Sequence, residues 1–319
     1  LMLTVPDEWL SVAYVMAAQA FSGIAKDLNK MSAKAGVKLF MPDQSDVRLF
    51  RWVAILTGSK NALKGAGFFI GGALLAWLEF RGALFVLSAM LFVALTVTWA
   101  LLPTGLGKTK SSAKFSQVFS KSPQINWLSC ARFFLFGARD IWFVVGLPVY
   151  LQSVLGWTFT QVGAFLALWV IGYGVIQGIA PGLIRAASTG EPGARTLVIW
   201  TGLLLLLPVG IALALQQGMD AGVVLIVGLA LFGIVFAMNS ATHSYLIVSW
   251  SDHDRVSMNV GFYYMANAGG RLTGTILSGL AYQQYGMAGC LYFSAGFILL
   301  ALLASMKLDR LKPVATTAQ

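Results

Sequence analysis

Two lysines stand four residues apart in an apolar stretch of the sequence, Leu49 to Leu78, that is long enough to cross a bilayer. Their spacing places Lys60 and Lys64 on one face of a helix. A charged side chain at mid-membrane costs at least about 2.5 kcal/mol, so it usually faces a cavity, a partner charge or a ligand. The pair therefore predicts one wall of a site for an anion.

Four more charged residues lie in other apolar stretches. Arg132 and Arg139 are seven residues apart and hence on one helix face, and Arg271 lies in a later stretch. Asp140 follows Arg139 directly, so we expect it to point elsewhere and to pair with a cation of a neighbouring helix or to take a proton. The five cations exceed this one carboxylate, and a buried charge without a partner is strongly disfavoured. The missing negative charge would come from a substrate or from helices outside this chain.

Polar side chains accompany the charges. Tyr264, Asn267 and Arg271 recur at three- and four-residue steps, and His243 belongs to a polar patch of the preceding helix. Arginine forms planar, bidentate hydrogen bonds with phosphate-like oxygens, whereas lysine adds a point charge. We predict that an anionic substrate is bound by Lys60, Lys64, Arg132, Arg139, Arg271, Asn267 and Tyr264. Asp140 and His243 are the candidates for binding a coupling proton.

Structural alternatives exist for each assignment. Arg132 lies near the predicted cytoplasmic boundary and could extend to the lipid headgroups. His243 and Asn267 could each join two helices by a hydrogen bond. The other cations could pair with carboxylates on helices outside this chain.

The composition is that of an all-α polytopic membrane protein. Of the 319 residues 58% are hydrophobic and only 11% are charged, too few to cover the surface of a soluble domain. Repeated apolar runs of about 20 residues predict transmembrane helices. We predict nine, at residues 8–25, 49–79, 82–102, 125–151, 160–184, 196–216, 220–248, 257–281 and 287–306.

The loops between these helices alternate in charge. Sixteen of the 22 lysines and arginines fall in one set of loops, and Arg81 alone falls in the other. The positive-inside rule places the basic set, and with it the C-terminus, in the cytoplasm of a bacterial inner membrane. The net charge of +10 then reflects orientation in the bilayer, and no nucleic-acid partner is expected.

The distribution of helices predicts two lobes. Three helices in residues 1–102 precede a basic cytoplasmic linker, 103–124, and six follow it in residues 125–306, with a tail at 307–319. Transporters with two six-helix halves carry a long cytoplasmic loop between the halves. We therefore expect an N-terminal lobe that lacks its first three helices.

Motifs for enzymatic chemistry are weak. Gly107, Lys108 and Thr109 resemble the end of a phosphate-binding loop, but Leu102 replaces the glycine that this loop requires. The two cysteines form no paired motif, so neither a disulfide framework nor a thiol metal site is indicated. We expect neither a cofactor nor an enzymatic activity.

The helix count and the central basic loop resemble the major facilitator superfamily. Two segments, 23–34 (GIAKDLNKMSAK) and 56–72 (LTGSKNALKGAGFFIGG), resemble its organoarsenical-efflux permeases. This resemblance implies export of an arseno-phosphoglycerate, made when a glyceraldehyde-phosphate dehydrogenase accepts arsenate in place of phosphate. It also implies a functional link to that dehydrogenase and a role in arsenate resistance.

Two other functions stay open on the sequence alone. One is major-facilitator transport of another phosphorylated metabolite or a drug. The other is a membrane protein that does not transport and whose intramembrane charges are structural.

Overall fold

In a computed structural model of the protein, the ranges 46–101, 122–187, 192–251 and 256–311 are described. Shorter pieces near the N-terminus are described at 4–9, 14, 18, 21–26, 28–29 and 32–33. The long elements in these ranges are all α-helices. Almost all of the predicted linker 103–124 and much of the predicted first helix 8–25 lie outside the described residues.

The described helices follow the predicted order. After a short 3-10 turn, η2 (Asp7–Trp9), they are α2 (Asp46–Leu101), α3 (Pro123–Phe143), α4 (Gly146–Ser153), α5 (Phe159–Ala187), α6 (Ala194–Gln216), α7 (Ala221–Ser249) and α8 (Val256–Asp309). The predicted helix 125–151 is wrong as one continuous element, because α3 ends at Phe143 and α4 begins at Gly146.

Two of these helices are hairpins of two legs. α2 is broken at Glu79 and α8 at Gly286, where the backbone takes non-helical angles. At about 1.5 Å per residue, 54 residues of unbroken helix would exceed twice the thickness of a bilayer core. Eight of the nine predicted spans thus coincide with described helices or with one leg of a hairpin, where α3 and α4 together account for the span 125–151. A nine-helix count is not confirmed, since 8–25 is largely outside the described residues.

Six of the described helices are long and apolar enough to cross a membrane, with the two legs of α8 counted together. In α2 only the second leg, Trp77–Leu101, meets this criterion. The first leg carries Lys60, Lys64 and two arginines near its start, which lower its hydropathy. The protein is a multi-pass membrane protein.

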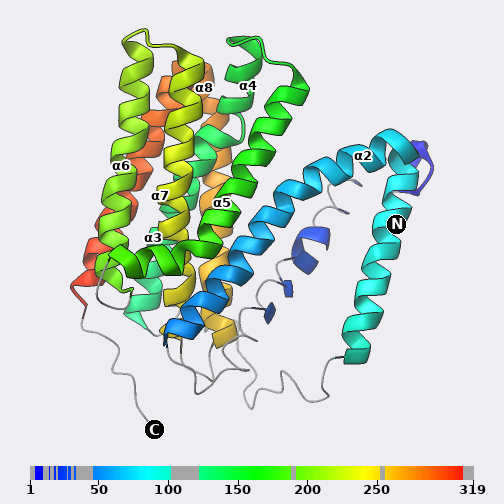
Figure 1. The fold of residues 1–319 in the computed structure, drawn as a ribbon, viewed down its shortest axis with the longest axis horizontal. Helices are drawn as coiled ribbons and strands as arrows, with labels where there is room; N and C mark the ends of the chain where they lie inside the picture. Colours follow the sequence, from blue (N-terminus) through cyan, green and yellow to red (C-terminus); the bar gives the residue numbers. More distant parts are fainter. Residues whose placement is uncertain are drawn as a thin grey trace.

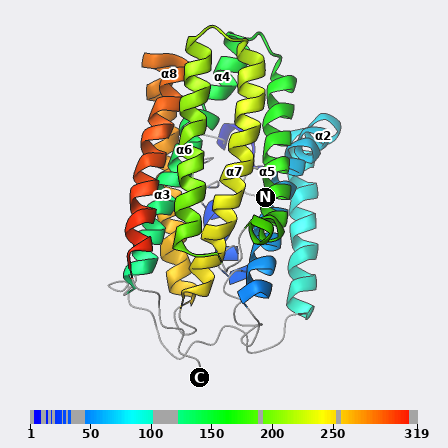
Figure 2. The same cartoon turned by 60° about the vertical axis from the view of Figure 1, so that its left-hand side comes forward.

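The helices form a bundle from which α2 leans away (Figure 1). α3, α4, α5, α6, α7 and α8 make up the bundle, with α3 packed mainly on α8. We call the end of the bundle with Ser122, Ser251 and Leu311 the linker end, and the end with Leu155, Gln217 and Gly286 the turn end. The view turned by 60° shows α2 beyond α5 again (Figure 2).

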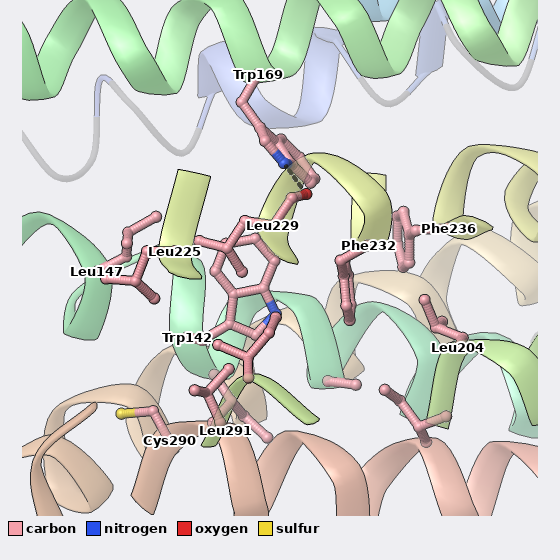
Figure 3. Close-up of a cluster of buried hydrophobic side chains, with 14 of the residues drawn as sticks. Trp142, Leu147, Trp169, Leu204, Leu225, Leu229, Phe232, Phe236, Cys290 and Leu291 are labelled. Carbon is pink, nitrogen blue, oxygen red and sulfur yellow. Dashed lines mark hydrogen bonds between the residues drawn. The ribbon is translucent and has the colours of Figure 1, made fainter. Parts of the chain in front are cut away.

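An aromatic core holds the bundle together (Figure 3). The rings of Trp142 and Trp169 meet edge to face with centroids 5.5 Å apart, and Phe232 packs on Trp142 at 5.1 Å. Nε1 of Trp169 donates a hydrogen bond to the carbonyl oxygen of Leu229, 2.7 Å away. Aromatic rings bury large areas, so this core fixes α3, α5 and α7 to one another as one lobe.

A second buried cluster joins α2 to that lobe at the linker end. Leu49, Phe50 and Val53 of α2 are almost fully buried there. The ring of Phe50 lies 5.0 Å from that of Tyr245 in α7. The second leg of α2, in contrast, is exposed along the window from Trp77 to Leu101. Within the described residues, α2 therefore contacts the bundle near the linker end and diverges from it toward the turn end (Figure 1).

The two hairpin breaks predict opposite effects of substitution. Glu79 has φ 55° and ψ −178°, a conformation that is essentially restricted to glycine and costs another residue roughly 1–3 kcal/mol. Glu79→Gly should therefore raise the melting temperature in detergent, by the equivalent of about 1 kcal/mol. Gly286→Ala should lower it, because Gly286 has φ 63° and an added Cβ would meet no atom within 4 Å, so only backbone strain acts. Glu79→Ala, which keeps the strain, is the control; an equal gain from it would contradict this explanation.

Candidate functional site

The site is organised by a close crossing of α3 and the first leg of α8. A Cβ on Gly270 would overlap the carbonyl group of Phe133, and one on Gly274 would overlap the carbonyl group of Gly137. Glycine is needed at both positions because these contacts are with backbone atoms that cannot move aside. The crossing brings the polar residues of the two helices within hydrogen-bonding distance.

Asp140 is the buried centre of an ion-pair cluster. Its side chain is fully buried, and its Oδ2 accepts a hydrogen bond from Nε of Arg271 on α8 at 2.8 Å. Its Oδ1 accepts from Nε of Arg139 at 2.7 Å and from Nη2 of the same arginine. Pairing of Asp140 with a cation of a neighbouring helix is confirmed. The expectation that Arg139 and Asp140 point apart is wrong, because the long arginine side chain bends back over its neighbour.

A third cation approaches this cluster from the other lobe. Lys64 on α2 interacts electrostatically with Arg139 and Arg271, and more weakly with Asp140. Lys64 is exposed and forms no ion pair with Asp140 within 4 Å, so the ion pairs themselves join two arginines to one carboxylate, with Lys64 as a more distant third cation. Arg139 is 13% exposed and Arg271 40% exposed, so neither guanidinium is fully shielded, in contrast to Asp140.

Arg132 forms a separate centre two turns along α3. It is only 4% exposed and donates hydrogen bonds to Oδ1 of Asn267 and Oγ of Ser240, both at 3.1 Å. In the part of the chain that the structure describes, no carboxylate pairs with it. Its guanidinium lies 3.7 Å from the ring centroid of Phe136, and that of Arg139 lies 5.1 Å from the same ring. The two guanidinium carbons are therefore at most about 9 Å apart.

Ser240 is the hub of a buried polar network. Besides Arg132, its Oγ accepts a hydrogen bond from Nε2 of Gln177 at 3.1 Å and shares one with the hydroxyl of Tyr173 at 3.0 Å. Oε1 of Gln177 in turn accepts a hydrogen bond from Nδ2 of Asn61 on α2. The network therefore runs from α3 through α7 and α5 to the other lobe.

Arg132 also has polar neighbours on α7 and α8. His243 is buried, its ring lies 6.5 Å from that of Tyr263, and its Nδ1 has no hydrogen-bond partner among the described residues. Arg132 lies 5.1 Å from the ring of Tyr263, which packs edge to face on Tyr264 at 5.7 Å. The proposed roles of these groups in substrate or proton binding stay predictions.

The structure thus brings Arg139, Arg271, Asp140 and Lys64 into one cluster, and Arg132 and Asn267 into a second. Lys60 lies one turn nearer the linker end, and its side chain is exposed. Four residues of the network were not among the predicted site residues: Asn61, Tyr173, Gln177 and Ser240. The sequence did contain a signal for Gln177, because a glutamine inside an apolar helix needs hydrogen-bond partners. The structure shows that this side chain is fully buried.

The contact between α2 and α5 depends on glycines of both helices. A Cβ on Gly58 would come within 2.5 Å of the carbonyl oxygen of Gly174, and a Cβ on Gly174 would overlap the backbone of Ala62. A Cβ on Gly58 would also overlap the backbone of Gly178, whereas a Cβ on Gly178 itself would meet no atom within 4 Å. A cavity of about 590 Å³ beside the crossing is lined by Gly58, Gly174 and their neighbours, and none of the site cations lines it.

Residues 192–319 match the family model described as Major Facilitator Superfamily. This part comprises α6, α7 and α8. A comparison of the sequence with curated proteins gave no match.

Two solved structures are similar over nearly the whole chain. One is a bacterial homologue of the iron transporter ferroportin in an outward-facing state: 19% identity, TM-score 0.72, covering 96% of this chain and 75% of that one. The other is the human organic anion transporter MFSD10 (TETRAN): 18% identity, TM-score 0.70, covering 92% of this chain and 71% of that one. The fold is that of these transporters. The predicted all-α, major-facilitator-like fold is thus confirmed, whereas the division into two lobes stays a prediction and the organoarsenical subfamily is not confirmed.

Removing the carboxylate tests the ion-pair cluster. Asp140→Asn leaves Arg139 and Arg271 without their common partner, and we expect a loss of about 2–3 kcal/mol of stability, less than for a fully buried pair because Arg271 is partly exposed. The double variant Asp140→Asn with Arg271→Gln restores the net charge and should recover part of that loss. Thermal melting in detergent measures both. A double variant less stable than Asp140→Asn would contradict the charge-balance explanation.

The glycine crossing predicts a conformational effect. Gly174→Ala cannot fit against the backbone of Ala62, so we expect α2 and α5 to separate at the linker end. A cysteine at Ala54, fully buried there, should then react several-fold faster with a water-soluble thiol reagent than in the parent with Cys130→Ser. Gly178→Ala, one turn along α5, is the matched control and should change nothing. Equal reactivity in both variants would refute the prediction.

Proposed function

We propose that the protein is a secondary transporter that exports an organic oxyanion by alternating access. The observation that carries the proposal is an excess of positive charge: Arg139 and Arg271 share the carboxylate of Asp140, Lys64 lies within electrostatic range of both arginines, and no carboxylate of the described residues pairs with Arg132. Rings of arginine and lysine line pathways for anions and phosphates. Buried positive charge of this kind is stabilised by a bound anion.

The arrangement of helices supports alternating access. α2 touches the bundle near the linker end and diverges from it toward the turn end (Figure 1). If the basic linker end is cytoplasmic, this is an outward-facing shape, the state named for the similar ferroportin homologue.

For the substrate class, the two similar structures point in different directions. One is described as an iron-transporter homologue and the other as an organic anion transporter. A metal cation would be repelled by the cluster of Lys64, Arg139 and Arg271, whereas an anion would be attracted. The charges of the site therefore favour the anion.

Within that class we propose an arsenate ester of phosphoglycerate as the substrate. It carries two oxyanion groups, which suits two cationic centres at most about 9 Å apart beside Phe136. Trivalent arsenic would instead prefer several thiolates, and Cys130 and Cys290 are separate free cysteines. The proposal includes arsenate resistance together with a glyceraldehyde-phosphate dehydrogenase that makes the ester. The alternative is another phosphorylated metabolite.

The membrane potential would assist export of such a substrate. An interior that is negative drives each negative charge outward by about 2.3 kcal/mol per 100 mV. Antiport of a proton, with Asp140 or His243 as the candidate, stays a prediction.

Neutral variants test the anion site. In everted membrane vesicles, Lys64→Gln and Arg271→Gln should each raise the KM for a phosphoglycerate-type anion roughly tenfold, the effect of losing about 1.4 kcal/mol of charge-assisted binding. Lys307→Gln, which removes an exposed lysine at the end of α8, is the control and should leave KM unchanged. Unchanged KM in both site variants would refute the anion site. Arsenate resistance of cells that also express the dehydrogenase tests the substrate separately.

A further inference from the structure

Hydrogen bonds connect Arg132 with the contact between the lobes. Asn61 of α2 donates to Oε1 of Gln177 in α5, and Nε2 of Gln177 donates to Oγ of Ser240 in α7 at 3.1 Å. Arg132 of α3 donates to the same oxygen at 3.1 Å. Asn61 stands one turn from Gly58, where α2 and α5 cross, so this chain forms only when the lobes touch at the linker end.

The hydrogen-bonding capacity of Ser240 is used completely. A serine hydroxyl has one proton to donate and two lone pairs to accept with. Its contacts with Arg132, Gln177 and Tyr173 therefore require that it accepts from the first two and donates to the tyrosine. Ser240 is fully buried, so Gln177 holds its oxygen toward Arg132 without competition from solvent.

The acceptors of Arg132 in this conformation are neutral oxygens. Ser240 supplies one and Asn267 the other. An anionic oxygen would bind the same guanidinium about twice as strongly as a neutral one. Asn267 and Ser240 bind the Nε and Nη1 groups of Arg132, so an anion that binds the Nη1 side of the guanidinium competes with Ser240, and the competition is stronger while Gln177 fixes Ser240 in place.

We propose that the chain Asn61–Gln177–Ser240 lowers the anion affinity of Arg132 whenever the lobes touch at the linker end. Separation of α2 from α5 removes Asn61 from Gln177, whose amide then turns to another donor and releases Ser240. Arg132 becomes available to an anion that enters from the linker end. Closure of that end restores the chain, weakens the anion's hold and promotes release at the turn end.

This inference rests on the proposed function for the direction in which the anion moves. The coupling between the hydrogen bonds and the conformation, however, can be tested without a substrate. By reciprocity, hydrogen bonds that disfavour the anion in one conformation also stabilise that conformation when the protein is empty. Gln177 and Asn61 act through other groups, so both are positioning residues. A merely structural role for Gln177 would change the stability of the bundle and leave the balance of conformations unaltered.

Distances across the turn end measure that balance directly. Spin labels at the exposed positions Phe80 and Val154 report by double electron–electron resonance whether the turn end is open. In the protein without ligand, Gln177→Leu should reduce the ratio of turn-end-open to turn-end-closed molecules about three- to tenfold, as expected for the loss of one or two hydrogen bonds. Asn61→Ala should shift the ratio in the same direction, because it removes the hydrogen bond to Gln177 from the side of α2. This second variant covers the case in which Gln177→Leu does not fold.

The control removes an equally buried hydrogen bond that does not belong to the series Asn61–Gln177–Ser240. Nδ2 of Asn239 donates to Oγ1 of Thr201 at 2.8 Å, between α6 and α7 of one lobe. Thr201→Val should lower the melting temperature and leave the ratio unchanged. A ratio in Gln177→Leu and Asn61→Ala equal to that of the parent would overturn the inference.

A second measurement uses inorganic phosphate as the probe. Added phosphate should shift the parent toward the turn-end-closed form, and the shift should be several-fold smaller in Asn61→Ala, where the coupling is lost. No effect of phosphate on any variant, combined with a changed ratio in the empty protein, would refute the anion site and leave the coupling standing. If neither the ratio in the empty protein nor the shift caused by phosphate differs between the variants and the parent, the coupling is overturned.

Discussion

The charge of Asp140, buried among apolar helices, is the constraint around which the centre of the molecule is arranged. A carboxylate that is fully buried must be paired, and two arginines from two helices supply the partners. That pairing is possible because Gly270 and Gly274 let α8 approach the backbone of α3. Two arginines exceed what one carboxylate neutralises, and this excess of positive charge is the basis of the proposed anion site.

The two lobes have unequal tasks in this arrangement. The aromatic core of Trp142, Trp169 and Phe232 packs α3, α5 and α7 together, so in the proposed alternating access the arginines of the bundle would keep their positions while α2 moves. α2 contributes only Lys64 to the cluster and Asn61 to the network, and it meets the bundle through glycines and a short apolar patch. A contact of that kind can part and re-form, which is what rocking of one lobe against the other requires.

Much of the helix pattern could be predicted from the sequence, since an apolar run of the length of a bilayer has few other structures available. For the same reason the break at Gly286 fell between the predicted spans 257–281 and 287–306, and the break at Glu79 fell on the last residue of the predicted span 49–79. The break between α3 and α4 escaped prediction, because the apolar run continues through Val144 and Val145 without a polar residue.

The candidate site was predictable as a set of charges but not as a set of contacts. Each intramembrane charge is conspicuous against apolar neighbours, so Arg139, Asp140 and Arg271 stand out. Whether Arg139 bends back to Asp140 depends on a rotamer set by packing, and spacing along the helix does not determine it. Ser240 resembles any other small helix residue in the sequence, and its role depends on three other helices meeting at one oxygen.

The central claim is that the space between the lobes carries an organic anion. Flux through the purified protein in liposomes tests it most directly, with a phosphoglycerate-type dianion and Fe²⁺ measured side by side under an imposed membrane potential. The excess of positive charge predicts dianion flux well above that of empty liposomes, rising with the potential that drives negative charge, and no Fe²⁺ flux above background. Transport of Fe²⁺ without transport of the dianion would contradict it.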